Sequence, residues 1–243
     1  MRIAIVSDIH GNRTALRAVL ADLRQTSPDL ICHGGDLAAN GAHPAEVVDT
    51  IQDLHWLGVC GNTDEMLWAP ERLAELALQV PKLQSLFRTF QEIVPTTREW
   101  LGEDRLHWLR RLPEIQRQES FAVVHASPNN LWRAPMPTAT DAELRAVYGD
   151  LGVPIAVYAH IHRPYIRRFS EMCVANTGSV SLSYDGDTRA SYLVIDDHDI
   201  SIRRVDYDVE SEAEELRVCG LPHADWLCYV LRTGKYCRPP NHP

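Results

Sequence analysis

Three short apolar runs near the start of the chain each lead into a polar turn, and this rhythm constrains the fold more than any other feature. The runs, at residues 2–7 (RIAIVS), 29–33 (DLICH) and 55–60 (HWLGVC), are each predicted to form a buried strand. Two segments between them have apolar residues at helix spacing, namely Leu16, Val19, Leu20, Leu23, Val47, Val48, Ile51 and Leu54. A β-α-β-α-β order predicts parallel strands joined by right-handed crossovers, and hence an α/β fold.

The rest of the chain is predicted to complete a single domain over residues 1–243. A helical insertion is expected at about 66–120 and a helical tail from about 210. Further strands are predicted at 121–124, 155–158, 165–169, 172–175, 190–195 and 200–205. We expect the last four of these to form a second sheet, mostly antiparallel, that faces the first.

Composition and charge exclude several classes of protein. With 45% hydrophobic and 23% charged residues the chain has an ordinary globular balance, and no apolar run approaches the roughly 18 residues that span a bilayer. The chain opens without the pattern of a secretory signal, and its six cysteines form no CxxC pair, so we expect reduced thiols in the cytoplasm. A net charge of −9 argues against binding to long nucleic acid, although a bound metal can still attract a small phosphate ester.

Side chains that suit divalent metals follow the predicted strands directly. In parallel sheets ligands bind beyond the carboxyl ends of the strands, so the polar clusters at 8–12, 34–36 and 61–64 are expected to meet in one crevice. Seven good ligands stand in these and two later turns: Asp8, His10, Asp36, Asn62, His125, His160 and His162. Each follows an apolar strand, where a polar group costs free energy unless it is paired or bound to metal.

The number and type of these ligands indicate two metal ions. Seven ligands exceed what one ion takes from protein while keeping an open position, and they suffice for two ions about 3.5–4 Å apart that share a carboxylate. Nitrogen and oxygen donors without thiolate suit Mn, Fe, Zn, Co or Ni and do not choose among them.

The order of these groups resembles the five motifs of the calcineurin-like metallophosphoesterase superfamily. The matching groups are Asp8-x-His10, Gly35-Asp36, Gly61-Asn62, His125 and His160-x-His162. The longer runs similar to its compact prokaryotic branch are SDIHGN (7–12), GDLAANGAHPAE (35–46), GNTDE (61–65), VHASP (124–128), AHIHRP (159–164) and NTGSVS (176–181). The resemblance covers residues 1 to about 205.

The resemblance implies a two-sheet β-sandwich flanked by helices, in four layers, with the site at the strand ends. Its implied ligand sets are Asp8, His10 and His162 for one metal, Asn62, His125 and His160 for the other, and Asp36 as the bridge. Manganese is the ion we expect first. Roles in catalysis are implied for Asp36, Asn62, His125 and Asn12, and contacts with the substrate for Asn12, Arg163 and Thr63.

Thr63 is the departure from the family pattern that bears most on the chemistry. Many members carry a histidine there that protonates the leaving alkoxide, and a threonine hydroxyl is too weak an acid to do so near pH 7. Asn40, Ala126 and Ala159 are smaller departures around the site. Among weaker candidates, Asp64 is expected to orient a neighbour by a hydrogen bond. Trp132, Arg133 and Tyr165 are expected to line a base-sized or apolar substrate pocket.

The expected function is hydrolysis of a phosphate ester by a hydroxide held between two metals. The missing acid at Thr63 favours a phosphodiesterase acting on small or nucleotide-like substrates. The alternatives are a phosphomonoesterase for phosphoproteins or dinucleotide polyphosphates, and a non-catalytic scaffold on the same fold. Such scaffolds lose ligands, whereas all seven are present here, so the scaffold is the least expected. The oligomeric state is left open, with a dimer as one option, and no membrane partner is expected.

Overall fold

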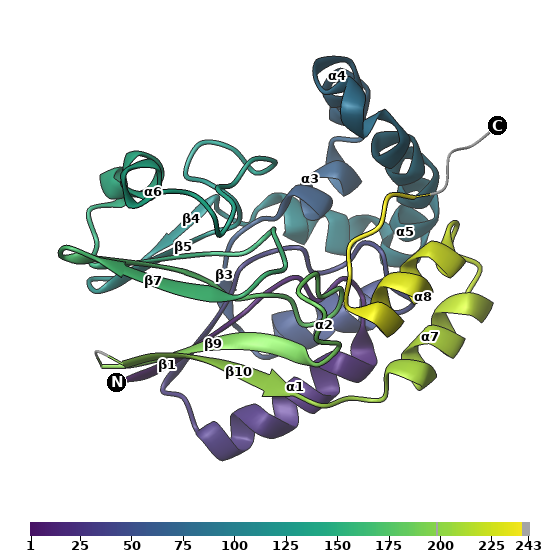
Figure 1. The fold of residues 1–243 in the computed structure, drawn as a ribbon. Coiled ribbons are helices and arrows are strands. Elements are labelled where there is room, and N and C mark those ends of the chain that lie inside the picture. The colour runs from purple at the N-terminus through teal and green to yellow at the C-terminus, as the bar shows by residue number, and fades with distance from the viewer. Residues whose placement is uncertain (198, 240–243) are drawn as a thin grey trace.

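Two five-stranded sheets lie face to face at the centre of the computed structural model, which describes residues 1–197 and 199–239 (Figure 1). The first sheet has the strand order β10-β9-β1-β2-β3 and the second β4-β5-β6-β8-β7. The strands are β1 (Arg2–Val6), β2 (Leu30–His33), β3 (Leu57–Gly58), β4 (Ile115–Arg117), β5 (Phe121–Val124), β6 (Ile155–Tyr158), β7 (Tyr165–Phe169), β8 (Met172–Asn176), β9 (Ala190–Asp196) and β10 (Asp199–Val205). The α-helices are α1 (Arg13–Thr26), α2 (Pro44–Asp53), α3 (Asn62–Trp68), α4 (Glu71–Gln79), α5 (Gln84–Arg110), α6 (Asp141–Tyr148), α7 (Val209–Val218) and α8 (Ala224–Thr233).

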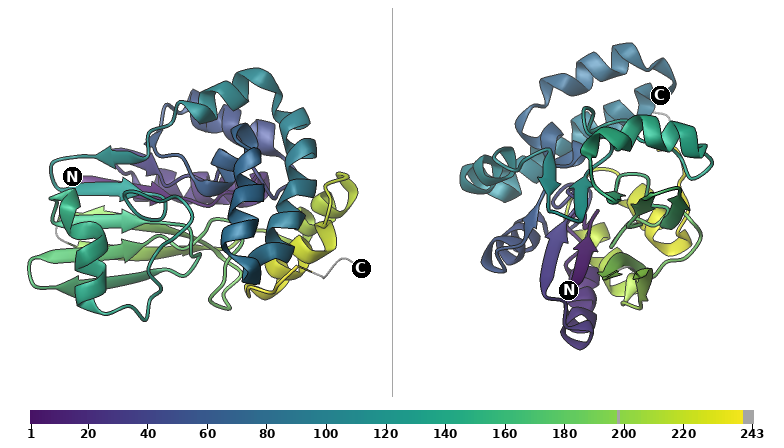
Figure 2. Two further views of the ribbon diagram at one scale, coloured as in Figure 1. Left: turned by 90° about the horizontal axis from the view of Figure 1, so that it is seen from above. Right: turned by 90° about the vertical axis from the view of Figure 1, so that its left-hand side faces the viewer.

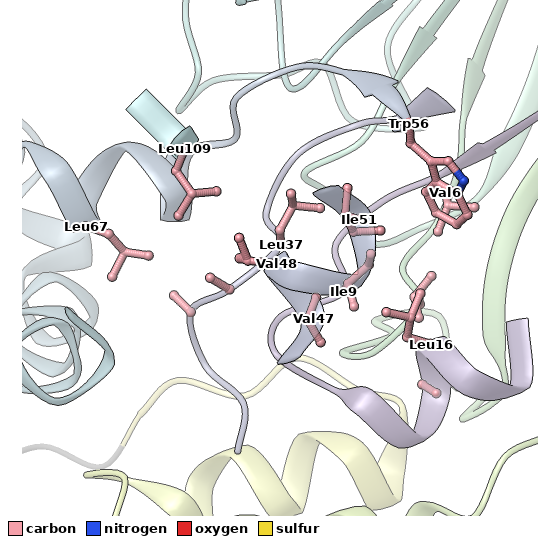
Figure 3. Packing of buried hydrophobic residues seen from close by; sticks show 14 of the residues in the cluster. Val6, Ile9, Leu16, Leu37, Val47, Val48, Ile51, Trp56, Leu67 and Leu109 are labelled. Atoms are coloured by element: carbon pink, nitrogen blue, oxygen red, sulfur yellow. The ribbon is translucent and has the colours of Figure 1, made fainter. Parts of the chain in front are cut away.

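Helices cover the outer faces of both sheets, which gives four layers: α1 and α2 pack on the first sheet and α6 on the second (Figure 1). Because side chains alternate along a strand, Ile3 and Ile5 of β1 pack between the sheets, whereas Ala4 and Val6 face the helices. Figure 3 shows part of this helix-facing cluster, which joins Val6 to Leu16 of α1. The α/β class and the two-sheet sandwich predicted from the sequence are confirmed.

The remaining helices gather at one end of the sandwich. Figure 2 shows α3 to α5 and α7 to α8 side by side at the end where β1 finishes, opposite its N-terminal start. The C-terminal ends of the parallel strands β1, β2 and β3 therefore point towards these helices (Figure 2).

The membership of the second sheet differs from the prediction. β7 and β8 belong to it, but β9 and β10 form a hairpin that extends the first sheet, with β9 antiparallel to β1. The second sheet is mixed, since β6 is parallel to both of its neighbours, β5 and β8. On β9, Tyr192 and Val194 face the helices while Leu193 and Ile195 pack between the sheets. Because β9 is buried on both faces, its sequence does not indicate whether it pairs with the edge of β1 or belongs to the second sheet.

The third predicted strand is much shorter than residues 55–60. Only Leu57–Gly58 pairs with β2, and the backbone N–H of Cys60 donates instead to the carbonyl of Pro113 at 2.9 Å. Gly58 lies against the ring of His33, where a Cβ atom would come within 2.3 Å of ring atoms. The chain leaves the sheet soon after this close contact.

The helical insertion has other bounds than the predicted 66–120. Helix α3 already begins at Asn62, with Gly61 as its N-cap, and α5 ends at Arg110. Residues 115–117 are not helical but form β4, an edge strand antiparallel to β5. The candidate ligand Asn62 thus stands at the first turn of a helix.

The C-terminal helices are held against the N-terminal half by polar contacts. Glu215 of α7 forms an ion pair with Arg13 at 3.2 Å, and its Oε2 lies 2.5 Å from His43 Nε2. Glu212 Oε2 accepts a hydrogen bond from the backbone N–H of Thr14 at 3.3 Å. None of the helices in the described part of the chain is both long and apolar enough to cross a bilayer.

Candidate metal centre

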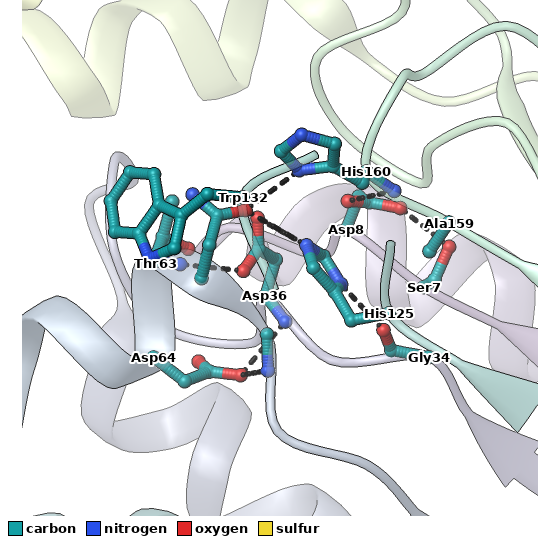
Figure 4. Close-up of polar contacts among 12 residues, drawn as sticks. Ser7, Asp8, Gly34, Asp36, Thr63, Asp64, His125, Trp132, Ala159 and His160 are labelled. Carbon is teal, nitrogen blue, oxygen red and sulfur yellow. Dashed lines mark hydrogen bonds and ion pairs between the residues drawn. The ribbon is translucent and has the colours of Figure 1, made fainter. Parts of the chain in front are cut away.

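The seven predicted ligands converge at this end of the sandwich, although five separate turns carry them. Figure 4 shows four of them, Asp8, Asp36, His125 and His160. The turns follow β1, β2, β3, β5 and β6 and carry, in that order, Asp8 and His10, Asp36, Asn62, His125, and His160 and His162. The expectation that the strand ends meet in one place is therefore confirmed.

Four of these side chains form a first group. The ligand atoms of Asp8, His10, Asp36 and His162 all lie within 4.8 Å of one another. His162 Nε2 is 3.2 Å from Asp8 Oδ1 and 3.3 Å from His10 Nε2. Nitrogen and oxygen lone pairs thus face a common point.

The second group lies next to the first, and Asp36 stands between them. Asn62 Oδ1 is 2.8 Å from both His125 Nε2 and His160 Nδ1. Asp36 Oδ2 is 3.5 Å from His125 Nε2 in this group and 3.7 Å from His10 Nε2 in the first. One carboxylate oxygen thus lies within 3.7 Å of an imidazole nitrogen in each group.

Left-handed backbone is concentrated at the candidate ligands. Five of the seven candidate ligands have a positive φ, namely Asp8 (53°), His10 (49°), Asp36 (55°), His160 (67°) and His162 (54°). This conformation is uncommon for residues other than glycine and costs on the order of 1–3 kcal/mol each, so it persists where the surroundings enforce it. Backbone hydrogen bonds between turns do so, including His10 N–H to the Asp36 carbonyl at 3.0 Å.

Backbone carbonyls orient three of the imidazoles. His10 Nδ1 is 2.9 Å from the Ala39 carbonyl, His125 Nδ1 is 2.8 Å from that of Gly34, and His162 Nδ1 faces another carbonyl. Because a carbonyl only accepts, each Nδ1 carries the proton, and the Nε2 lone pair points into the site as a metal ligand requires.

Asp64 fixes the turns that carry Asp36 and Asn62. Its carboxylate accepts hydrogen bonds from the backbone N–H groups of Asp36 (2.8 Å), Leu37 (2.9 Å) and Gly61 (3.1 Å) (Figure 4). The expectation that Asp64 orients a neighbour is confirmed, and the neighbour is the backbone of Asp36.

Burial determines the charge of the site. Burial raises the pKa of Asp8 and that of Asp36 to about 6. It lowers the pKa of His10 and His162 to about 4, and that of His160 well below its usual value. In the described part of the chain, neither carboxylate forms an ion pair with lysine or arginine. Buried acids beside neutral imidazoles, without a fixed counter-charge or a thiolate, fit hard or borderline divalent cations.

A cavity of about 450 Å³ opens onto this group. The candidate ligands that line it are His10, Asp36, Asn62, His160 and His162. Thr63 lines it too, and its backbone N–H donates to Asp36 Oδ1 at 2.8 Å. A molecule in the cavity would therefore contact both ligand groups and the threonine that replaces the usual acid.

The structure places the other residues that were predicted to contact the substrate differently from one another. Trp132 and Arg133 line the cavity as expected, but Tyr165 does not, because its hydroxyl is hydrogen-bonded to that of Tyr158 on the second sheet (2.8 Å). Arg163 directly follows His162 in the sequence but is not among the lining residues, so its contact with substrate stays a prediction.

Asn12 acts as a helix cap in this structure. Its Oδ1 accepts from the backbone N–H of Ala15 at 2.8 Å at the start of α1, and its Nδ2 donates to Ser181 Oγ at 3.1 Å. These bonds engage both ends of the amide, and Asn12 does not line the cavity. Its role in catalysis and substrate binding stays a prediction.

Sequence reasoning missed Glu65 and several aromatic residues. Glu65 is buried, and its Oε2 accepts a hydrogen bond from the indole N–H of Trp132 at 2.6 Å, which holds that ring at the cavity. Tyr184, Trp226 and Tyr236 line the cavity from segments far from the motifs. Their only signal was aromatic character, which a packed core explains equally well.

Comparisons with known proteins agree with this geometry. Residues 1–199 match the model of the calcineurin-like phosphoesterase superfamily domain. The chain is 30% identical to the uncharacterized protein MJ0912 of Methanocaldococcus jannaschii over 257 aligned positions, which cover 96% of this chain and 98% of that protein. A metallophosphoesterase from Sphaerobacter thermophilus has a similar structure with a TM-score of 0.79 and 25% identity, covering 96% of this chain and 99% of its own. The hypothetical protein PH1004 from Pyrococcus horikoshii OT3 shares the fold with a TM-score of 0.83 and 18% identity, covering 97% of this chain and 99% of its own. The chain therefore belongs to the calcineurin-like phosphoesterase superfamily and is a metal-dependent phosphoesterase.

Proposed function

We propose that this protein is a phosphodiesterase that uses two divalent metal ions, with manganese as the ion to test first. Asp8, His10 and His162 would hold one ion, Asn62, His125 and His160 the other, and Asp36 both. The observation that carries this proposal is the position of Asp36, whose Oδ2 lies 3.7 Å from His10 Nε2 and 3.5 Å from His125 Nε2.

The protein's own residues would orient the groups that bind the ions and the phosphate ester. Two bound ions would supply a nucleophile from water near neutral pH and neutralise the charge of the phosphoryl group. Carbonyls fix the imidazole lone pairs towards the ions, and Asp64 fixes the turn of Asp36. The cavity beside them admits a phosphate ester to within contact of both groups.

Thr63 supports a preference for diesters. It lies at the cavity next to Asp36, where its hydroxyl is too weak an acid to protonate a leaving alkoxide near pH 7. Diesters with a good leaving group need less protonation than alkyl monoesters do. The six cysteines are all unpaired, which supports a reducing compartment such as the cytoplasm.

The test compares bis(4-nitrophenyl) phosphate with 4-nitrophenyl phosphate on protein reconstituted with manganese. We expect a higher kcat/KM for the diester, about two ions per chain by elemental analysis, and loss of activity with EDTA. Asp36→Asn is the control, because it keeps the shape of the side chain and removes its charge. A higher kcat/KM for the monoester would favour the phosphomonoesterase, and full activity without metal would overturn the proposal.

A further inference from the structure

The cavity above the metal centre is polar at its floor and apolar along its walls. Beyond the candidate ligands, Thr63 and Asn40, the lining side chains are aliphatic or aromatic with one exception, Arg133. The aliphatic and phenyl part of the wall comes from the insertion: Leu76, Val80, Leu83, Leu86, Phe87 and Phe90. A further part comes from the chain after residue 180, with Leu182, Tyr184, Trp226 and Tyr236.

The polar edges of both indoles are directed away from a ligand. The indole N–H of Trp132 donates to Glu65 Oε2 at 2.6 Å, and that of Trp226 donates to the carbonyl of Cys237 at 3.0 Å. The carbon atoms of both indoles therefore face the cavity. Tyr184 stacks on the ring of His162, with ring centroids 4.4 Å apart, so its ring continues the apolar wall down to the floor.

Apart from Arg133 and the hydroxyls of Tyr184 and Tyr236, the polar side chains that line the cavity belong to its floor. Asn40 is buried, and its Oδ1 has no hydrogen-bond partner in the described part of the chain. It follows Ala39, whose carbonyl holds the His10 ring, so this free acceptor lies at the level of the ligands. A donor on the substrate near its phosphorus would satisfy it.

Charge around the cavity disfavours nucleotides and polyphosphates. Further phosphates need cationic partners, yet Arg133 is the one lysine or arginine among the described lining residues. The neighbouring cavity shares Trp132 and Arg133 with this one and is also lined by Glu75, by Glu114 and by Arg72, whose guanidinium is paired with Glu65. A base would lose hydrogen bonds to water and find few partners on walls of this composition.

We propose that the natural substrate is a phosphodiester whose retained group is a hydrocarbon chain, of the kind found in lipids. The phosphoryl group would lie at the floor, and the chain would run between the insertion and the C-terminal helices. This inference rests on the proposed function for the reaction, and on the cavity walls for the substrate class. A cavity of about 450 Å³ is in the range that holds an extended organic group.

The test is a series of 4-nitrophenyl alkyl phosphates from methyl to octyl, with 4-nitrophenol as the common leaving group. Burial of each methylene is expected to raise kcat/KM about fourfold until the cavity is full. Binding of the matching alkylphosphonates, followed by calorimetry and by tryptophan fluorescence, should tighten by the same factor. The 4-nitrophenyl ester of thymidine phosphate is the nucleotide comparison.

Two leucines of α4 provide a matched pair of variants. Leu76 lines the cavity, whereas Leu78 is 83% exposed on the same helix. Leu76→Gln should flatten the dependence on chain length, so that kcat/KM for the octyl ester falls more than kcat/KM for the methyl ester. Leu78→Gln should behave as the wild type in both assays.

The outcomes separate the two proposals. Hydrolysis of the methyl ester with no dependence of kcat/KM or Kd on chain length would overturn the substrate class and leave the phosphodiesterase standing. A preference for the thymidine ester over the octyl ester would overturn the substrate class as well. Phosphonate binding that tightens with chain length, in a metal-loaded protein that hydrolyses no ester, would overturn the proposed reaction and support the ligand class.

Discussion

His33, the last residue of β2, is expected to make the protein sensitive to acid. The ring is fully buried against Gly58, and neither ring nitrogen has a hydrogen-bond partner in the described part of the chain. Burial lowers the pKa of His33 from 6.5 to about 3. In the unfolded chain the same imidazole binds a proton near its usual pKa. Replacing His33 with leucine removes this difference between the two states.

The size of the effect follows from the two pKa values. With the pKa lowered on folding, the unfolded state binds more protons than the folded state below pH 6.5, so stability falls as the pH falls towards about 3. At pH 7.5 the linkage is negligible, and at pH 5 it amounts to about 2 kcal/mol of lost unfolding free energy.

Urea unfolding at pH 7.5 and pH 5, on metal-free wild type and His33→Leu, measures this difference. The unfolding free energy of the variant should fall by about 2 kcal/mol less than that of the wild type between the two pH values. Changes in packing shift both values of the variant equally and cancel. His107→Gln, on the exposed side of α5, is the control for the loss of one histidine. An equal pH dependence in wild type and His33→Leu would refute the reasoning.

Three further predictions concern the metal centre. Asp36→Ala should lower the metal content more than any other single change among the ligands, because it removes a donor from both groups; elemental analysis checks this, and a larger loss in another variant would contradict it. His162→Ala should weaken binding of the ion beside Asp8, and His160→Ala should weaken binding of the other ion. Anomalous scattering should show a lower occupancy of a different ion in each variant. Loss of the same ion in both variants would count against the assignment. Thr63→His should raise kcat/KM for esters with alkyl leaving groups by up to about 10²-fold and for nitrophenyl esters much less. An equal dependence on leaving-group pKa in wild type and variant, with the new ring in the site, would mean that the proton comes from elsewhere.

The sequence predicted the strand ends well because the features there are local. Each ligand follows a strand whose apolar character is visible over a few residues, and parallel order places those ends at one edge. The placement of β9 was not predictable in the same way. Tyr192 and Leu193 are buried on opposite faces, and such a strand carries no alternation that says which sheet it joins.

The cavity could not be predicted because its walls meet only in the folded chain. Leu83 and Trp226 face the same space, yet one lies in the insertion and the other in the tail. Either residue alone resembles a core position, and no spacing within the sequence relates them. Likewise Asn12 appeared suited to phosphate by its position beside His10, whereas its neighbours in space, Ala15 N–H and Ser181, engage its amide.

The left-handed ligand positions have a consequence for how the protein acquires its metals. Because Asp8, His10, Asp36, His160 and His162 are held by the backbone, an arriving ion finds its donors already in place and need not reorganise the chain. Exchange of one ion for another then carries little conformational cost. Which metal resides there is set by the affinity order of nitrogen and oxygen donors and by the supply in the cell. The same polypeptide produced in media of different metal content should therefore be recovered as different metalloforms with one backbone structure.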